Sequence, residues 1–255
     1  MTGTQPLLRF DGVSHQFGAV EVLNDLSLAV YPGEFVALVG PSGCGKTTLL
    51  NLCSGWVEPT RGRIHRPDGV RMVFQQDGLF PWLTVGENVR LGLRHLPDET
   101  ARARKADAML ELIGLEAFTA HYPHQLSGGM RQRVELARAL GGGTDLLLMD
   151  EPFSSVDYLT RLKLRAELAR LLRDQPRTVV LVTHDIEEAA QLADRVLVLS
   201  ERPARINDEV RLAVPRPRDA THPTVVAAVH RILTELGLEA DAEPLAAARG
   251  MENDR

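Results

Sequence analysis

One stretch of this sequence constrains the fold more than any other: a short apolar run that leads directly into a glycine-rich loop. Phe35–Val39 is apolar at every position, which is typical of a strand buried on both faces of a mainly parallel sheet. The loop Gly40–Thr47 reads GPSGCGKT and fits the pattern G-x-x-x-x-G-K-[ST], and a helix is expected over Thr47–Ser54. A strand, such a loop and a helix in this order form a phosphate-binding site. The sequence therefore predicts an α/β fold built around that loop.

Further apolar runs extend the predicted sheet and frame it. Alternating apolar and polar residues predict an N-terminal hairpin over Leu7–Phe17 and Val20–Val30. From about Thr84 to Ala139 the apolar residues follow a helical period instead. Other strands are expected at Arg61–His65, Val70–Phe74, Leu146–Asp150, Thr178–Thr183 and Arg195–Ser200, and other helices at Leu159–Arg173, Asp185–Asp194 and Thr224–Leu236.

These elements together predict the domain organisation. Strands that alternate with helices imply crossover connections and a largely parallel sheet. We expect a P-loop NTPase core with a mainly parallel sheet, an N-terminal antiparallel β-subdomain and an inserted helical subdomain. One nucleotide-binding domain is predicted over residues 1–240, with the helical subdomain at about residues 77–140 and a frayed tail at residues 241–255.

Composition excludes several classes of function. The formal net charge is −5, so the chain lacks the basic surplus of a nucleic-acid-binding protein, and no nucleic-acid partner is expected. No apolar stretch approaches the roughly 18–20 residues that span a bilayer. Met1–Phe10 lacks the apolar core of a secretory signal, and the two cysteines, Cys44 and Cys53, fit a reducing compartment. A soluble or membrane-peripheral chain is expected.

The loop residues have defined tasks toward a nucleotide. Lys46 is expected to reach the β- and γ-phosphates, and the Thr47 hydroxyl is expected to ligate Mg²⁺. The alternative, a chance glycine turn, is disfavoured by the apolar strand before the loop and the helix after it. ATP and Mg²⁺ are therefore the expected bound groups. The residues expected to contact ATP here are Gly40, Pro41, Ser42, Gly43, Cys44, Gly45, Lys46, Thr47 and Thr48.

Polar residues also follow two later apolar runs. Asp150 and Glu151 come at the end of Leu146–Met149, and His184 follows Thr178–Thr183. Because the carboxyl ends of parallel strands meet at one edge of a sheet, these residues should lie beside the phosphate loop. Asp150 is then an expected partner of Mg²⁺, and Glu151 the general base that polarises the attacking water. Two roles stay open for His184: a catalytic contact to the γ-phosphate, or a structural one at a strand end.

A fourth segment gives these motifs a family context. Leu126–Arg133 reads LSGGMRQR, and it lies between the phosphate loop and Asp150-Glu151, with His184 further on. With these motifs in this order, the chain resembles the ATPase subunits of ABC transporters over most of its length. Without that resemblance, Leu126–Arg133 is a polar helix N-terminus.

The resemblance implies that the active site is shared between two copies of the chain. In the family, two copies associate head to tail with two ATP molecules at the interface. Ser127, Gly128 and Gly129 of one copy then close over the γ-phosphate held by the other. Asp157 matches the acidic residue of the loop that contacts the partner copy. A second copy of the chain is therefore an expected partner.

Two more residues follow from the resemblance. Gln75 matches the glutamine that senses Mg²⁺ and the γ-phosphate, which makes it a further expected metal and catalytic residue. Gln76 is adjacent, and the choice between the two stays open. Phe17 matches the aromatic residue that stacks on adenine; a core aromatic is the alternative.

The surroundings of the motifs indicate which kind of ABC protein this is. One nucleotide-binding domain without a membrane span is similar to the separate ATPase subunits of bacterial importers. Gly78–Val89 and Leu199–Ile206 resemble the nitrate/sulfonate/taurine importer ATPases in particular. That implies a peripheral subunit on the cytoplasmic face of the inner membrane, with integral membrane permease subunits as partners and, indirectly, a solute-binding protein. A stand-alone ABC ATPase and an exporter ATPase subunit are the alternatives.

The same resemblance singles out an apolar segment. Leu79–Trp82 is expected near the surface that meets the permease, because exposed aromatic residues often anchor a partner. Packing within the helical subdomain is the alternative for each of its residues.

Overall fold

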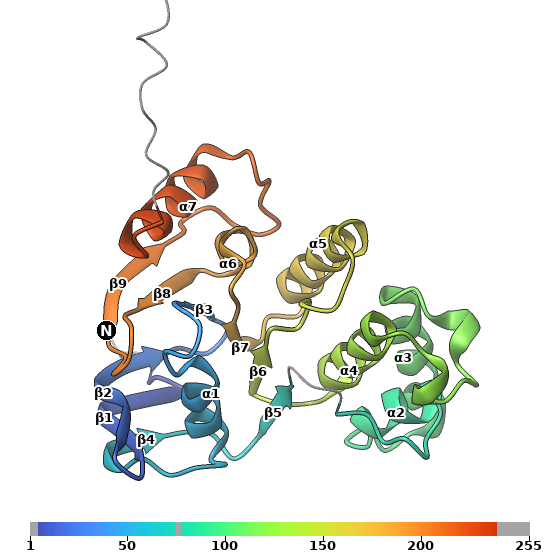
Figure 1. The fold of residues 1–255 in the computed structure, drawn as a ribbon. Helices are drawn as coiled ribbons and strands as arrows, with labels where there is room; N and C mark the ends of the chain where they lie inside the picture. Colours follow the sequence, from blue (N-terminus) through green and yellow to red (C-terminus); the bar gives the residue numbers. More distant parts are fainter. Residues whose placement is uncertain (1–4, 75–77, 239–255) are drawn as a thin grey trace, which may run out of the picture.

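The computed structural model describes residues 5–74 and 78–238 and places them around a six-stranded sheet (Figure 1). The strand order is β5-β6-β7-β3-β8-β9, and every neighbouring pair is parallel except β8 and β9. The predicted α/β class with a mainly parallel sheet is thereby confirmed. The strands span Val70–Val73 (β5), Leu146–Asp150 (β6), Thr178–Val182 (β7), Phe35–Val39 (β3), Arg195–Leu199 (β8) and Ile206–Arg211 (β9).

Two apolar clusters cover the two faces of this sheet. Alternate residues of β3 belong to different clusters: Phe35, Ala37 and Val39 pack in one, and Val36 and Leu38 pack in the other. All five residues are buried. Since successive side chains of a strand point to opposite faces, a strand covered on both faces has to be apolar at every position. This requirement explains the apolar runs from which the central strands were predicted.

A separate three-stranded antiparallel sheet lies beside α1, in the order β2-β1-β4 (Figure 1). Leu8 and Phe10 of β1 share an apolar cluster with Leu49 and Leu50 of α1. The predicted N-terminal hairpin is confirmed, and its turn places Gly18 at a φ of 58°. The elements span Leu8–Phe17 (β1), Val20–Val30 (β2), Arg61–His65 (β4) and Lys46–Ser54 (α1).

Three helices lie together beyond β5, at the opposite end of the molecule from the antiparallel sheet (Figure 1). Helix α4 packs against both α2 and α3. The side chains of Thr84, Asp98 and Ser127 accept hydrogen bonds from the first backbone N–H groups of these helices, which fixes where each helix begins. The division at about residues 77–140 stays a prediction. The elements are α2 (Val85–Gly92), α3 (Glu99–Leu112), α4 (Gly128–Gly141) and the short helices Glu116–Phe118 (η1) and Pro123–Gln125 (η2).

The sequence prediction for the segment after Ser200 is incomplete. It names no strand there, whereas β9 pairs antiparallel with β8 at the edge of the sheet. Val210 is buried but the rest of β9 is at most partly covered, so this edge strand lacks an apolar run. Within the described ranges, no helix is both long and apolar enough to cross a membrane. The remaining helices are α5 (Tyr158–Asp174), α6 (Ile186–Leu192) and α7 (Pro223–Glu235).

Two arginines bind the segment after β9 to the sheet. The Asp194 carboxylate accepts a hydrogen bond from the backbone N–H of Phe35 at 3.0 Å and pairs with Arg216 at 3.1 Å and Arg218 at 3.3 Å. The guanidinium of Arg218 is buried and also donates to the backbone carbonyls of residues 191, 193, 212 and 214. A single side chain therefore provides the donors for four backbone carbonyls and for the Asp194 carboxylate.

Replacing Arg218 with methionine should lower the free energy of unfolding by about 2–4 kcal/mol, because the buried carbonyls and Asp194 lose their donor while the volume is kept. Equilibrium urea unfolding measures this change. Arg211→Met is the matched control, since the Arg211 side chain is 76% exposed and pairs with Glu209 at the surface. We expect no measurable effect there. Wild-type stability of Arg218→Met would contradict the role given to this arginine.

Candidate active site

The phosphate loop runs from the end of β3 to the start of α1. Gly45 precedes α1 with a φ of 123°, a conformation that L side chains rarely adopt. A Cβ atom at Gly45 would also lie 2.7 Å from Val22 of β2, so only glycine fits there. The Lys46 ammonium donates to the carbonyls of Gly40 and Pro41 at 2.8 and 2.9 Å. The lysine side chain thus folds back onto the start of its own loop.

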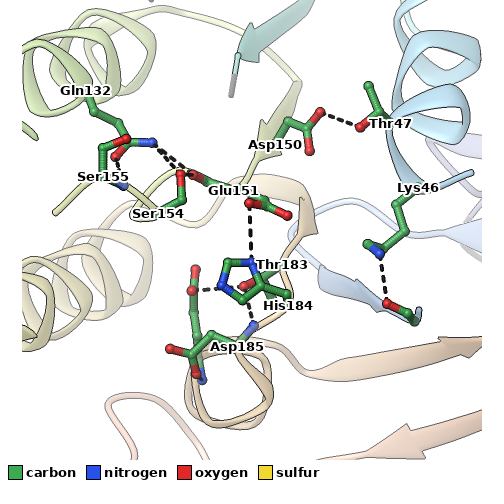
Figure 2. Close-up of polar contacts among 12 residues, drawn as sticks. Lys46, Thr47, Gln132, Asp150, Glu151, Ser154, Ser155, Thr183, His184 and Asp185 are labelled. Atoms are coloured by element: carbon green, nitrogen blue, oxygen red, sulfur yellow. Dashed lines mark hydrogen bonds and ion pairs between the residues drawn. The ribbon is translucent and has the colours of Figure 1, made fainter. Parts of the chain in front are cut away.

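A hydroxyl and a carboxylate meet beside the loop. Thr47 Oγ1, at the start of α1, donates to Asp150 Oδ2, at the end of β6, over 2.9 Å (Figure 2). Burial raises the pKa of the Asp150 carboxyl, and the hydrogen bond from Thr47 opposes that shift. Hard oxygen ligands of this kind suit Mg²⁺. Within the described ranges, no group of three or more His, Cys, Asp or Glu residues could hold a metal.

The carboxylate of Glu151 is held by His184. The Nδ1 atom of His184 lies 3.2 Å from Glu151 Oε2 (Figure 2). Glu151 follows β6 directly, and its backbone N–H donates to the carbonyl of Val182 in β7 at 2.9 Å. Its φ of 47° lies in the left-handed region, which is uncommon for a residue other than glycine and costs on the order of 1 kcal/mol. The neighbouring strand ends therefore impose the direction in which this carboxylate points.

One cavity of about 570 Å³ collects the residues at these strand ends. It is open to the surface and brings the phosphate loop together with Glu151 and with the end of β1. Phe17 is 52% exposed, so its ring is available at the cavity and is not a core aromatic. The lining residues are Phe17, Val20, Val22, Ser42, Gly43, Gly45, Lys46, Thr47, Thr48, Glu151, Val182 and Arg202.

Three loop residues predicted to contact ATP do not line the cavity in this structure. Gly40 and Pro41 instead supply the carbonyls that hold Lys46. The Cys44 side chain is buried among apolar residues, and burial raises the pKa of its thiol. The backbone of these residues shapes the loop.

The segment that resembles the ABC signature lies outside the cavity. Ser127, Gly128 and Gly129 are absent from its lining in the described part of the chain. Ser127 Oγ accepts from the N–H of Met130 at 3.3 Å and so caps α4. Asp157 caps α5 by accepting from the N–H of Thr160 at 3.0 Å, and this hydrogen bond lowers the pKa of its carboxyl. Within one copy, these residues therefore form helix starts.

Gln132 connects α4 to the catalytic strand end. Its amide nitrogen donates to the backbone carbonyl of Glu151 at 2.9 Å, and its amide oxygen accepts from the N–H of Ser155 at 2.9 Å (Figure 2). Gln132 is buried, and it lies within the quoted LSGGMRQR motif without having been given a role from sequence. Its contacts tie the helix that Ser127 caps to Glu151.

A buried carboxylate on α4 binds the backbone of Phe74 and Gly78, the described residues that flank the predicted sensor glutamine in the sequence. Glu135 accepts from the N–H of Phe74 at 3.0 Å and from the N–H of Gly78 at 3.1 Å. Gln75 and Gln76 lie between these two residues, outside the described ranges. The helical period of the apolar residues predicts α4, but it does not predict that Glu135 is buried or what it binds.

Helix α5 stabilises the turn that carries His184. Arg165 is buried and pairs with both Asp185 and Glu188, the latter at 3.4 Å. Thr183 Oγ1 donates to Glu188 at 3.0 Å, and Asp185 caps α6 by accepting a hydrogen bond from the N–H of Glu188. Burial raises the pKa of Glu188 to about 7 although Arg165 opposes it. This network fixes the backbone on both sides of His184.

Comparison with known proteins agrees with this geometry. The family model for ABC transporters matches residues 23–154, just over half of the chain. An aliphatic sulfonates import ATP-binding protein of Rhodococcus jostii is 43% identical over 90% of this chain and 93% of its own length. A taurine import ATP-binding protein of Jannaschia sp. is 42% identical over 76% of each chain.

Solved structures give the same result. A dimeric bacterial ABC transporter cassette superposes with a TM-score of 0.73 at 33% identity, over 81% of this chain and 99% of that one. A cassette in a post-hydrolysis state bound to ADP and phosphate superposes with a TM-score of 0.72 at 32% identity, with the same coverage. Fold, cavity and relatives together show that the chain belongs to the ABC transporter family, as one of its ATP-binding and ATP-hydrolysing subunits.

Proposed function

We propose that this chain is the ATPase subunit of a bacterial ABC importer that takes up a small sulfonate. The observation that carries the proposal is the cavity in which the phosphate loop and Glu151 meet, in a chain whose relatives over nine-tenths of its length are named as import ATP-binding proteins for aliphatic sulfonates. Taurine, an aliphatic sulfonate, appears in the name of a further relative. The transported solute would be bound by other chains.

The residues of the cavity divide the work of ATP hydrolysis. The backbone N–H groups of Gly43 and Gly45–Thr48 and the Lys46 ammonium bind the phosphates, and Phe17 stacks on adenine. Glu151 accepts the proton of the water that attacks the γ-phosphate, and His184 keeps the carboxylate directed into the cavity. Mg²⁺ held by Thr47 and Asp150 would supply charge neutralisation at the phosphates.

A second copy of the chain completes the site. Ser127, Gly128 and Gly129 lie outside the cavity of their own copy, and Ser127 stands at a helix N-terminus, where backbone N–H groups favour an anion. In a head-to-tail dimer this N-terminus would meet the γ-phosphate held by the partner copy, with Asp157 at the same interface. Gln132 would then connect the signature helix of each copy to its own Glu151.

Gln75 remains the proposed sensor of Mg²⁺ and the γ-phosphate, with Gln76 as the neighbouring candidate. Both follow β5, whose neighbour in the sheet is β6, the strand that carries Asp150. Glu135 fixes the backbone of Phe74 and Gly78, the described residues on either side of them.

The permease is proposed to dock on the loop before α2. Trp82 is 69% exposed, and its ring lies 5.4 Å from that of Phe80, which also contacts the Arg138 guanidinium at 5.6 Å. Asn88 is buried and bonds to the backbone of Phe80 in both directions, at 2.9 and 3.2 Å. An exposed aromatic pair on a held loop is a good anchor for a protein partner.

Such docking would place the chain at the cytoplasmic face of the inner membrane, as a peripheral subunit of a complex that also involves a solute-binding protein. A stand-alone ATPase or an exporter subunit would use the same cavity. The names of the relatives favour import over both alternatives.

Glu151→Gln should lower kcat for ATP by roughly 10²–10⁴-fold while ATP binding is kept, because glutamine preserves the shape but cannot accept the proton of the attacking water. Steady-state phosphate release and equilibrium binding of ATP measure the two quantities. Glu201→Gln, an exposed glutamate on the turn after β8, is the control and should leave both unchanged. Normal turnover of Glu151→Gln would remove this residue from the catalytic role.

Import is tested by growth on a sulfonate. A strain that lacks the gene should fail to grow on taurine or an alkanesulfonate as the only sulfur source, and the wild-type gene should restore growth. Trp82→Ala should not restore it, because the permease loses its anchor, although the purified variant keeps its ATPase activity.

Trp56→Ala is the matched control, since Trp56 is 77% exposed but lies at the end of α1, away from α2. It should restore growth fully. Growth of the strain without the gene would contradict sulfonate import, whereas growth with Trp82→Ala would contradict only the docking surface.

A further inference from the structure

An arginine of the segment Leu199–Ile206, to which the sequence assigns no contact with the nucleotide, lies at the edge of the nucleotide cavity. Arg202 belongs to the turn after β8 and lines the cavity together with Phe17 and Lys46. Its guanidinium donates to the backbone carbonyl of Gly43, at the tip of the phosphate loop. It therefore contacts the loop on which the phosphates of ATP would lie.

The turn that carries Arg202 is fixed on both sides. The backbone N–H groups of Ser200 and Arg205 donate to the carbonyl of Arg205 and the hydroxyl of Ser200, both at 2.9 Å, which closes the turn. Ala204 bonds to β2 in both directions, through the carbonyl of Val22 at 2.8 Å and the N–H of Asn24 at 3.1 Å. Since Val22 lines the same cavity, the turn is part of its wall.

The charges of the cavity favour a second cationic side chain beside Lys46. Its charged lining residues are Lys46, Arg202 and Glu151. The carboxylate of Glu151 repels phosphate, while the Lys46 ammonium already shares its donors with the carbonyls of Gly40 and Pro41. Nucleotide phosphates carry several negative charges, more than Lys46 and a bound Mg²⁺ would balance beside the carboxylate of Glu151, so a second cationic side chain has a role.

Arg202 has the chemistry to provide this cation. A guanidinium has five N–H donors and no acceptor, and its planar fork matches phosphate oxygens. Apart from the bond to Gly43, Arg202 makes no hydrogen bond or ion pair with any residue in the ranges 5–74 and 78–238. Arg202 is exposed, so its remaining donors face solvent at the cavity edge and are available to the phosphates of a bound nucleotide.

We propose that Arg202 is a nucleotide-binding residue that donates to the phosphate oxygens of ATP, as a second cation beside Lys46. The inference rests on the proposed binding of ATP in this cavity. It gives a role in nucleotide binding to a residue of Leu199–Ile206, a segment that stands out in the sequence only by its resemblance to importer ATPases.

The test compares variants in the full-length chain that also carries Glu151→Gln, so that ATP is not consumed. Arg202→Gln keeps an N–H donor for the Gly43 carbonyl but removes the charge, and Arg202→Lys keeps the charge. Calorimetry with Mg²⁺ gives the Kd for ATP and for inorganic triphosphate. Arg202→Gln should raise both by about 5–20-fold, as for loss of a charge-assisted hydrogen bond, and Arg202→Lys by less than about threefold.

Arg205→Gln is the control, because it removes the same charge from the same turn at an exposed residue that does not line the cavity. It should leave both constants unchanged. Three results would overturn the inference: an unchanged Kd in Arg202→Gln, a weaker Kd for ATP but not for inorganic triphosphate, or an equal loss in Arg205→Gln. If the protein with its native Arg202 binds no ATP, the proposed function itself fails.

Discussion

The parallel pairing of β3, β7 and β6 is the constraint on which the rest of the site depends. β7 lies between the other two, and Val180 pairs with Val36 on one side and Leu148 on the other. The phosphate loop, Asp150-Glu151 and His184 follow these three strands, so a single sheet edge collects residues that are far apart in sequence. The apolar burial of the strands on both faces holds that edge in place.

Buried polar side chains then connect this edge to the helices around it. Gln132 joins α4 to the backbone of Glu151, and Arg165 joins α5 to Asp185 and Glu188, which follow His184. Each of these groups is buried and would be costly to leave without a partner. Helices α4 and α5, which begin at Ser127 and Asp157, are therefore attached to the catalytic residues of their own copy. In the proposed dimer, however, both helix starts face the ATP that the other copy holds.

Much of this arrangement can be predicted from the sequence, because the signals are local. Apolar runs predict the central strands, and the order of the motifs along the chain identifies the family. β9 escaped prediction because an edge strand with one buried residue has no such run. No role at the site could be predicted for Gln132, Glu135 and Arg202 for a related reason. Their side chains carry no signal of their own in the sequence, and only the tertiary fold brings them to the site. The catalytic roles themselves remain predictions that rest on geometry.

The central claim, that each ATP site is built from two copies, is tested most directly by counting retained ATP in mixed dimers purified through two different tags. All copies carry Glu151→Gln, and the dimers combine Lys46→Ala, which disables the phosphate loop, with Ser127→Arg, which blocks the signature. With the two changes on different copies, one site carries both defects and the other is intact. The account predicts about one retained ATP per dimer for this arrangement and none when both changes are on the same copy. The reverse result, with ATP retained only when both changes share one copy, would contradict a shared site.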